Sequence, residues 1–129
     1  MAFETDRPRG LISVFVCDDS PAERFLMGQL IKDRTDLYLA GAASTAVGAV
    51  QAIAAAQPDV VLLDHLDHGS DVSVVVRAIR EVAPGVKLLI RSGLPETRIV
   101  GVSSADGYVG KTQDSESLWR AIGDVAQRS

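Results

Sequence analysis

The chain has 129 residues, of which 47% are apolar, 23% are charged and 5% are aromatic, and its formal net charge is −4. This length suits one domain around a single core, and the aliphatic content is too high for a disordered chain. The acidic balance argues against direct nucleic-acid binding, since phosphate contacts need clustered Lys and Arg. The one cysteine cannot form an internal disulfide. We therefore expect a cytoplasmic domain without membrane contact, with residues 1–10 as an N-terminal extension and 11–129 as the domain.

Three short aliphatic runs predict buried strands, at residues 11–17, 60–63 and 86–90. Each is apolar on both faces and ends at polar residues, which is typical of a parallel strand covered by helices on both sides. Weaker runs at 37–40 and 107–109 predict two more strands.

Helical patterns lie between these strands. Ser20, Pro21 and Glu23 form a helix start, with Ser20 as the N-cap and Glu23 completing a capping box. Phe25 and Leu26 begin the predicted apolar stripe of that helix. Three further helices are predicted: one over 45–56, one around the apolar stripe of Val72, Val75, Val76 and Ile79, which ends at Pro84-Gly85, and one around Leu118, Ala121, Ile122 and Val125. Alternation of strands and helices predicts an α/β fold with one five-stranded parallel sheet, doubly wound as (βα)5.

Charged and polar side chains follow the predicted strands where each one ends. They are Asp18 and Asp19, then Asp64, then Ser92, then Lys111. The carboxyl ends of parallel strands lie along one rim of the sheet, where ligands bind. Clustered carboxylates repel one another unless a cation is bound, and hard oxygen ligands favour Mg²⁺. A lysine beside them favours an anion with several oxygens, such as a phosphoryl group.

This arrangement resembles the receiver domain of two-component response regulators, over essentially the whole chain. That family has the flavodoxin/CheY-like fold, with an acidic pair after the first strand, an acceptor aspartate after the third, Thr or Ser after the fourth and Lys after the fifth. Tyr108 falls at the position of the switch aromatic of the family, and residues 105–111 and 118–122 are most similar to NarL/LuxR-type receivers.

The resemblance implies that Asp64 accepts a phosphoryl group from a sensor histidine kinase or phosphotransfer protein. Mg²⁺ would be held by Asp18 through a water, by Asp19, by Asp64 and by the backbone carbonyl of Leu66. Lys111 would pair with a phosphoryl oxygen. The domain would be a phosphoacceptor with slow autodephosphorylation and not an enzyme acting on other molecules.

Ser92 would bind a third phosphoryl oxygen and, with Tyr108, switch an output surface. The domain would be either a free-standing regulator or the regulatory half of a transcription factor whose output domain is not in this sequence. A homodimer is one possible form. Leu66 and Leu94 are apolar where the family orients a hydrolytic water, so a long-lived phosphorylated state is expected.

Several residues depart from the family pattern. Asp67 and His68 stand where Met-Pro is usual, and Thr112 follows the lysine where Pro is common. The segment between Ser92 and Tyr108 is short, which predicts a fourth helix cut by about one turn. Trp119 lies at the edge of the apolar stripe of the last helix. It is either the centre of an interface or folded over the gap left by the short fourth helix.

Two alternatives remain open on the sequence alone. His65, Asp67 and His68 resemble part of a zinc-hydrolase ligand motif, although these are the only two histidines in the chain. The other alternative is a receiver-like interaction module that is not phosphorylated, in which the polar residues of the rim have only a structural role.

Overall fold

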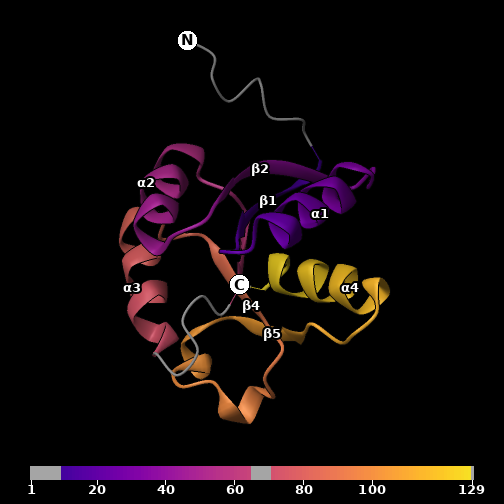
Figure 1. The fold of residues 1–129 in the computed structure, drawn as a ribbon. Helices are drawn as coiled ribbons and strands as arrows, with labels where there is room; N and C mark the ends of the chain where they lie inside the picture. The colour runs from indigo at the N-terminus through magenta and orange to yellow at the C-terminus, as the bar shows by residue number, and fades with distance from the viewer. Residues whose placement is uncertain (1–9, 65–70, 129) are drawn as a thin grey trace.

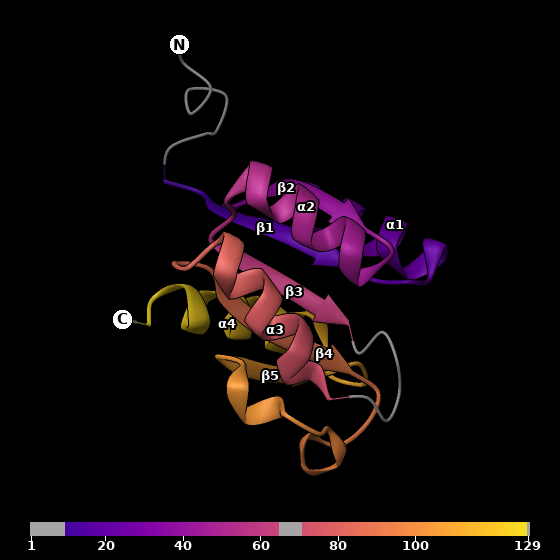
Figure 2. The same cartoon turned by 90° about the vertical axis from the view of Figure 1, so that its left-hand side faces the viewer.

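A computed structural model of the chain describes residues 10–64 and 71–128. It contains one parallel five-stranded sheet in the order β2-β1-β3-β4-β5, covered by helices on both faces (Figures 1 and 2). The strands are β1 (Ile12–Cys17), β2 (Leu37–Ala43), β3 (Val60–Asp64), β4 (Lys87–Ser92) and β5 (Gly107–Gly110), and the helices are α1 (Pro21–Lys32), α2 (Ala46–Ala56), α3 (Val72–Val82) and α4 (Ser115–Ala126). The predicted five-stranded parallel sheet with helices on both faces is confirmed, with four α-helices in the described residues.

The sheet separates two hydrophobic clusters because successive side chains of a strand point to opposite faces. In β1, Phe15 and Cys17 join the cluster beneath α2 and α3, whereas Val14 and Val16 join the cluster beneath α1 and α4. Both faces are thus buried, and this explains why the strands are apolar throughout instead of alternating with polar residues.

The buried stripe of α1 differs from the predicted one. Met27 and Ile31 are buried, whereas Phe25 is 70% exposed and Leu26 is 57% exposed. Residues spaced by four lie on the same side of a helix, so the stripe of Met27 and Ile31 continues backward to Glu23. The rotation of α1 that buries this stripe therefore turns Glu23 toward the sheet.

The crossover from β4 to β5 carries no α-helix. Two single-turn 3₁₀ helices replace the shortened fourth helix expected from the sequence, η2 (Glu96–Arg98) and η3 (Val102–Ser104). The segment between them attaches to the start of α3, where the Val72 amide donates to the Val100 carbonyl oxygen at 3.0 Å. Gly101 adopts a left-handed φ of 83° there.

Candidate functional site

The carboxyl ends of the strands bring four of the predicted residues to one rim of the sheet. Asp64 ends β3 and Ser92 ends β4, while Asp18 and Lys111 directly follow β1 and β5. The three residues Asp18, Asp64 and Ser92 are buried, with exposed fractions of 2%, 7% and 1%. Buried carboxylates need a charged or hydrogen-bonding partner.

Lys111 provides that partner for Asp64, whereas Asp18 accepts from the Ser20 amide. Its Nζ lies 2.6 Å from Oδ1 of Asp64 and 2.8 Å from Oε2 of Glu23. Burial alone would lower the pKa of Lys111, but the hydrogen bonds to Asp64 and Glu23 outweigh it and raise the pKa overall. The ammonium therefore stays charged between two carboxylates.

Glu23 is a site residue that the sequence pattern assigned only to the capping box of α1. Its backbone amide donates to Oγ of Ser20 at 3.2 Å, which is half of the predicted capping box. The other half is missing, because the Ser20 amide donates to Oδ1 of Asp18 at 3.0 Å. The Glu23 carboxylate instead reaches Lys111, whose hydrogen bond holds the pKa of Glu23 below its usual value.

Asp18, Glu23 and Asp64 form an acidic cluster in which one carboxylate oxygen from each residue lies within 4.8 Å of the others. The pKa of Asp18 is raised, first by burial and then by the neighbouring charge of Asp64. Carboxylate oxygens at this spacing are a donor set that suits a hard divalent cation such as Mg²⁺. Asp19 is exposed and lies outside this cluster.

Arg91 is a second cation close to the cluster. It stands opposite Asp64 in the pairing of β3 with β4, and it borders the same small internal gap as Asp18, Asp64 and Met27, which has no room for a water molecule. Its charge contributes to the lowered pKa of Glu23. Nothing in the strand pattern of residues 86–90 predicted it, since an arginine after an aliphatic run looks like a strand end.

Ser92 and Tyr108 are linked through the backbone of Leu94. The Leu94 amide donates to Oγ of Ser92 at 3.0 Å, and the hydroxyl of Tyr108 donates to the Leu94 carbonyl oxygen at 2.5 Å. Burial, followed by the charge of Glu96, raises the pKa of Tyr108 and keeps its hydroxyl protonated. A movement of the Ser92 hydroxyl would therefore break a contact with the same residue that anchors Tyr108.

Cys17, at the end of β1, takes no part in this chemistry. It is buried, and burial followed by the charge of Asp18 raises its pKa to about 12. A thiol in this environment is uncharged and unreactive.

Other predicted residues fall in different places. His65, Leu66, Asp67 and His68 lie outside the described residues. Trp119 is half-buried against the cluster beneath α1 and α4, with the guanidinium of Arg34 lying 5.0 Å from its ring centroid. The crossover residues Leu94, Val102 and Ala105 pack against the opposite cluster, so Trp119 does not fill the space of the shortened helix.

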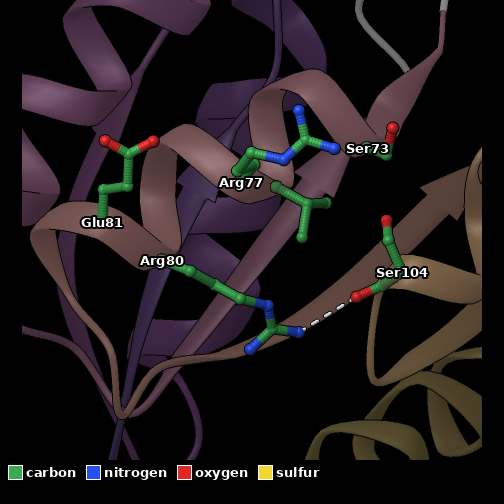
Figure 3. A pocket seen from close by; sticks show the side chains of 6 residues that line it. Ser73, Arg77, Arg80, Glu81 and Ser104 are labelled. Carbon is green, nitrogen blue, oxygen red and sulfur yellow. Dashed lines mark hydrogen bonds between the residues drawn. The ribbon is translucent and has the colours of Figure 1, made fainter.

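A second hollow of about 330 Å³ lies between α3 and η3 (Figure 3). Arg80 crosses its floor, donating to the carbonyl oxygen of Ser104 at 3.1 Å and to Oδ2 of Asp106 at 3.0 Å. The Leu88 amide also donates to Asp106, at 2.7 Å. These bonds hold the crossover against α3 and β4, so we assign Arg80 a structural role.

Known proteins of the same fold match nearly the whole chain. The signal receiver domain of the response regulator NarL from Mycobacterium tuberculosis superimposes with a TM-score of 0.80 and 27% identity, over 92% of this chain and 98% of that one. A structure of the phosphorylated P1 domain of CheA3 with CheY6 from R. sphaeroides gives a TM-score of 0.68 and 20% identity, over 91% and 98% of the two chains.

A curated relative adds a sequence match. A protein-glutamate methylesterase/protein-glutamine glutaminase from Nocardioides sp. is 31% identical over 121 residues, or 90% of this chain. The chain spans only 33% of the length of that relative. No family model matches the sequence. Across residues 10–64 and 71–128, no helix has the length and apolar character that a membrane span requires.

Proposed function

Since the chain is a response-regulator receiver domain, we propose that it accepts a phosphoryl group on Asp64 from the phosphohistidine of a sensor kinase or phosphotransfer protein. The observation that carries the proposal is the 2.6 Å ion pair of Asp64 with Lys111 beside the buried Asp18, at the carboxyl ends of three strands. It combines a nucleophilic carboxylate with a fixed cation for a phosphoryl oxygen.

In the transfer, a carboxylate oxygen of Asp64 forms a bond to phosphorus while the bond from phosphorus to the donor imidazole nitrogen breaks. The nitrogen keeps the electron pair and takes up a proton from water, and the imidazole leaves neutral. Lys111 pairs with a phosphoryl oxygen, and Ser92 donates its hydroxyl hydrogen to another.

The acidic cluster fits a divalent cation. Asp18 would hold Mg²⁺ through a water, with Asp19, Asp64 and the backbone carbonyl of Leu66 completing the protein ligands, the last lying outside the described residues. When bound, Mg²⁺ neutralises charge on the phosphoryl oxygens. Asp19 is exposed beside the cluster, so its side chain would have to turn inward to bind.

Phosphorylation is proposed to act through Ser92 and Tyr108. A Ser92 hydroxyl that donates to the phosphoryl group moves away from the Leu94 amide that it now accepts from. Leu94 also holds the Tyr108 hydroxyl, so the change reaches the surface formed by the crossover, β5 and α4. That surface would signal to an output domain, a second copy or a separate partner.

The partner assignment rests on CheY6, which has the same fold as this chain and was solved in complex with the phosphorylated P1 domain of CheA3. We propose a cytoplasmic signalling role in which the domain catalyses only its own phosphorylation and slow dephosphorylation. The methylesterase or glutaminase activity of the curated relative is not proposed here, because this chain matches only a third of it.

The test is phosphorylation by acetyl phosphate with Mg²⁺, followed by intact mass. We expect the mass of one phosphoryl group on the wild-type chain and none on Asp64→Asn, since an amide is not a competent nucleophile. The exposed Asp114, which caps α4, gives the control Asp114→Asn, which should be labelled normally. Equal labelling of Asp64→Asn would refute the acceptor assignment.

Two further outcomes would favour the alternatives. Stoichiometric zinc in the purified protein, with no labelling, would favour a hydrolase that uses His65, Asp67 and His68. If the purified protein contains no zinc and is not labelled, the result would favour an interaction module in which the Asp64–Lys111 pair is only structural.

A further inference from the structure

Glu23 is tied to the acceptor site by two independent features of α1. The buried stripe of Met27 and Ile31 places Glu23 on the face of the helix that points to the sheet. The Ser20 amide, which a capping-box glutamate would accept from, is already bonded to Asp18. The Glu23 carboxylate is therefore free of the helix start and bonds to Lys111 at 2.8 Å.

This contact competes with the proposed chemistry. The Lys111 ammonium is the cation that a phosphoryl group on Asp64 needs, and Glu23 already supplies it with an anionic partner. A Glu23 oxygen also lies within 4.8 Å of an Asp64 oxygen, in the space into which phosphoryl oxygens would extend. Like charges at such distances repel each other.

We infer that Glu23 is a positioning residue that holds Lys111 in the unphosphorylated protein and must release it before Asp64 is phosphorylated. This inference rests on the proposed function, because it concerns the rate at which the same site takes up a phosphoryl group. The carboxylate of Glu23 occupies the place at Lys111 that a phosphoryl oxygen takes later, and so it slows phosphorylation.

The first test compares phosphorylation rates with acetyl phosphate at saturating Mg²⁺, followed by intact mass. Glu23 is 40% exposed at its side chain, and pairs of this kind contribute modestly, so we expect Glu23→Gln to be phosphorylated about two- to five-fold faster than wild type. Glu23→Asp should be faster too, because it keeps the charge but is one methylene too short to reach Lys111. Glu116→Gln, at another exposed first-turn glutamate, is the control and should match wild type.

The second test measures the contact itself in metal-free protein, by NMR of the Lys111 ammonium. The signal should exchange with water faster in both variants than in wild type, since Glu23→Gln replaces a charged acceptor with a weaker neutral one and Glu23→Asp moves the carboxylate out of reach. A purely structural role of Glu23 in α1 would leave this signal unchanged.

The outcomes separate the two proposals. If wild type is labelled but neither Glu23 variant is faster, or Glu23→Asp behaves like wild type, the inference is wrong and the proposed function stands. A slower Glu23→Gln with a weaker calorimetric affinity for Mg²⁺ would make Glu23 a metal ligand instead, and would also overturn it. If no variant and no wild-type protein is labelled, the proposed function fails and the inference fails with it.

Discussion

Gly101→Ala tests whether the crossover between β4 and β5 depends on its attachment to α3. Gly101 has a φ of 83°, and a Cβ added there would lie 2.0 Å from Oδ1 of Asp71 and 2.9 Å from the Ser73 amide nitrogen. Asp71 is the N-cap of α3 and accepts from the Ser73 amide at 2.9 Å. The added methyl group must therefore displace the cap as well as adopt a left-handed backbone.

The two costs can be added. A left-handed conformation costs a non-glycine residue about 1–2 kcal/mol, and loss of an aspartate N-cap costs about 1 kcal/mol. We expect Gly101→Ala to lower the free energy of unfolding by about 2–3 kcal/mol. For a domain of this size that corresponds to a fall in Tm of roughly 6–15 °C.

The assay is urea denaturation followed by circular dichroism, with Gly85→Ala as the control. Gly85 has no atom within 4 Å of an added Cβ and no left-handed φ, so its variant should stay within about 0.5 kcal/mol of wild type. Because the clash acts through the cap, Asp71→Ala and Gly101→Ala should be less than additive together. A loss below about 0.5 kcal/mol for Gly101→Ala, or full additivity, would refute this reasoning.

Three further predictions concern the site and α4. In metal-free buffer, Asp18→Asn should raise Tm at pH 7. The pKa of Asp18 is raised in the folded state, so its charged carboxylate destabilises the fold. This cost disappears as the pH falls through that pKa and the carboxylate is protonated. The gain should shrink on acidification, and a gain that grows would contradict it. The phosphorylated state should last minutes or longer, since Leu94 offers no group to orient water; decay within seconds would contradict this. Beryllofluoride with Mg²⁺ should reduce acrylamide quenching of the Trp119 fluorescence. Trp119→Ala should weaken self-association or partner binding without affecting Asp64 labelling. Fluorescence that does not respond to beryllofluoride, together with a large stability loss in Trp119→Ala, would assign Trp119 to the core.

The strands were predictable because burial on both faces leaves a strong signal. Residues 60–63 are aliphatic at every position, and together with Asp64 they form β3, in which all five residues are buried. Once the strand ends are known, the parallel sheet brings the residues that follow them to the same rim, which is why Asp18, Asp64, Ser92 and Lys111 could be grouped in advance.

The crossover between β4 and β5 was harder to predict because no pattern of period 3.6 fills it. Pro95 begins the first 3₁₀ turn as its N-cap, and Gly101 with its left-handed φ separates it from the second. Each half is too short to repay the cost of nucleating an α-helix. Backbone bonds to α3 and the Arg80–Asp106 pair fix this segment instead, and such contacts between distant residues leave no periodic signal.

Glu23 shows how a satisfied local rule can hide a long-range contact. Ser20 followed by Glu23 matches a capping box, so the local pattern left nothing to explain. Yet Asp18, only two residues before Ser20, offers a carboxylate to the same amide, and the stripe of Met27 and Ile31 carries Glu23 inward. Choosing that stripe over Phe25 and Leu26 would have placed a glutamate at the rim that holds Lys111. The rotation of a helix about its axis thus decides whether a first-turn acid caps its own helix or enters a site 88 residues away along the chain.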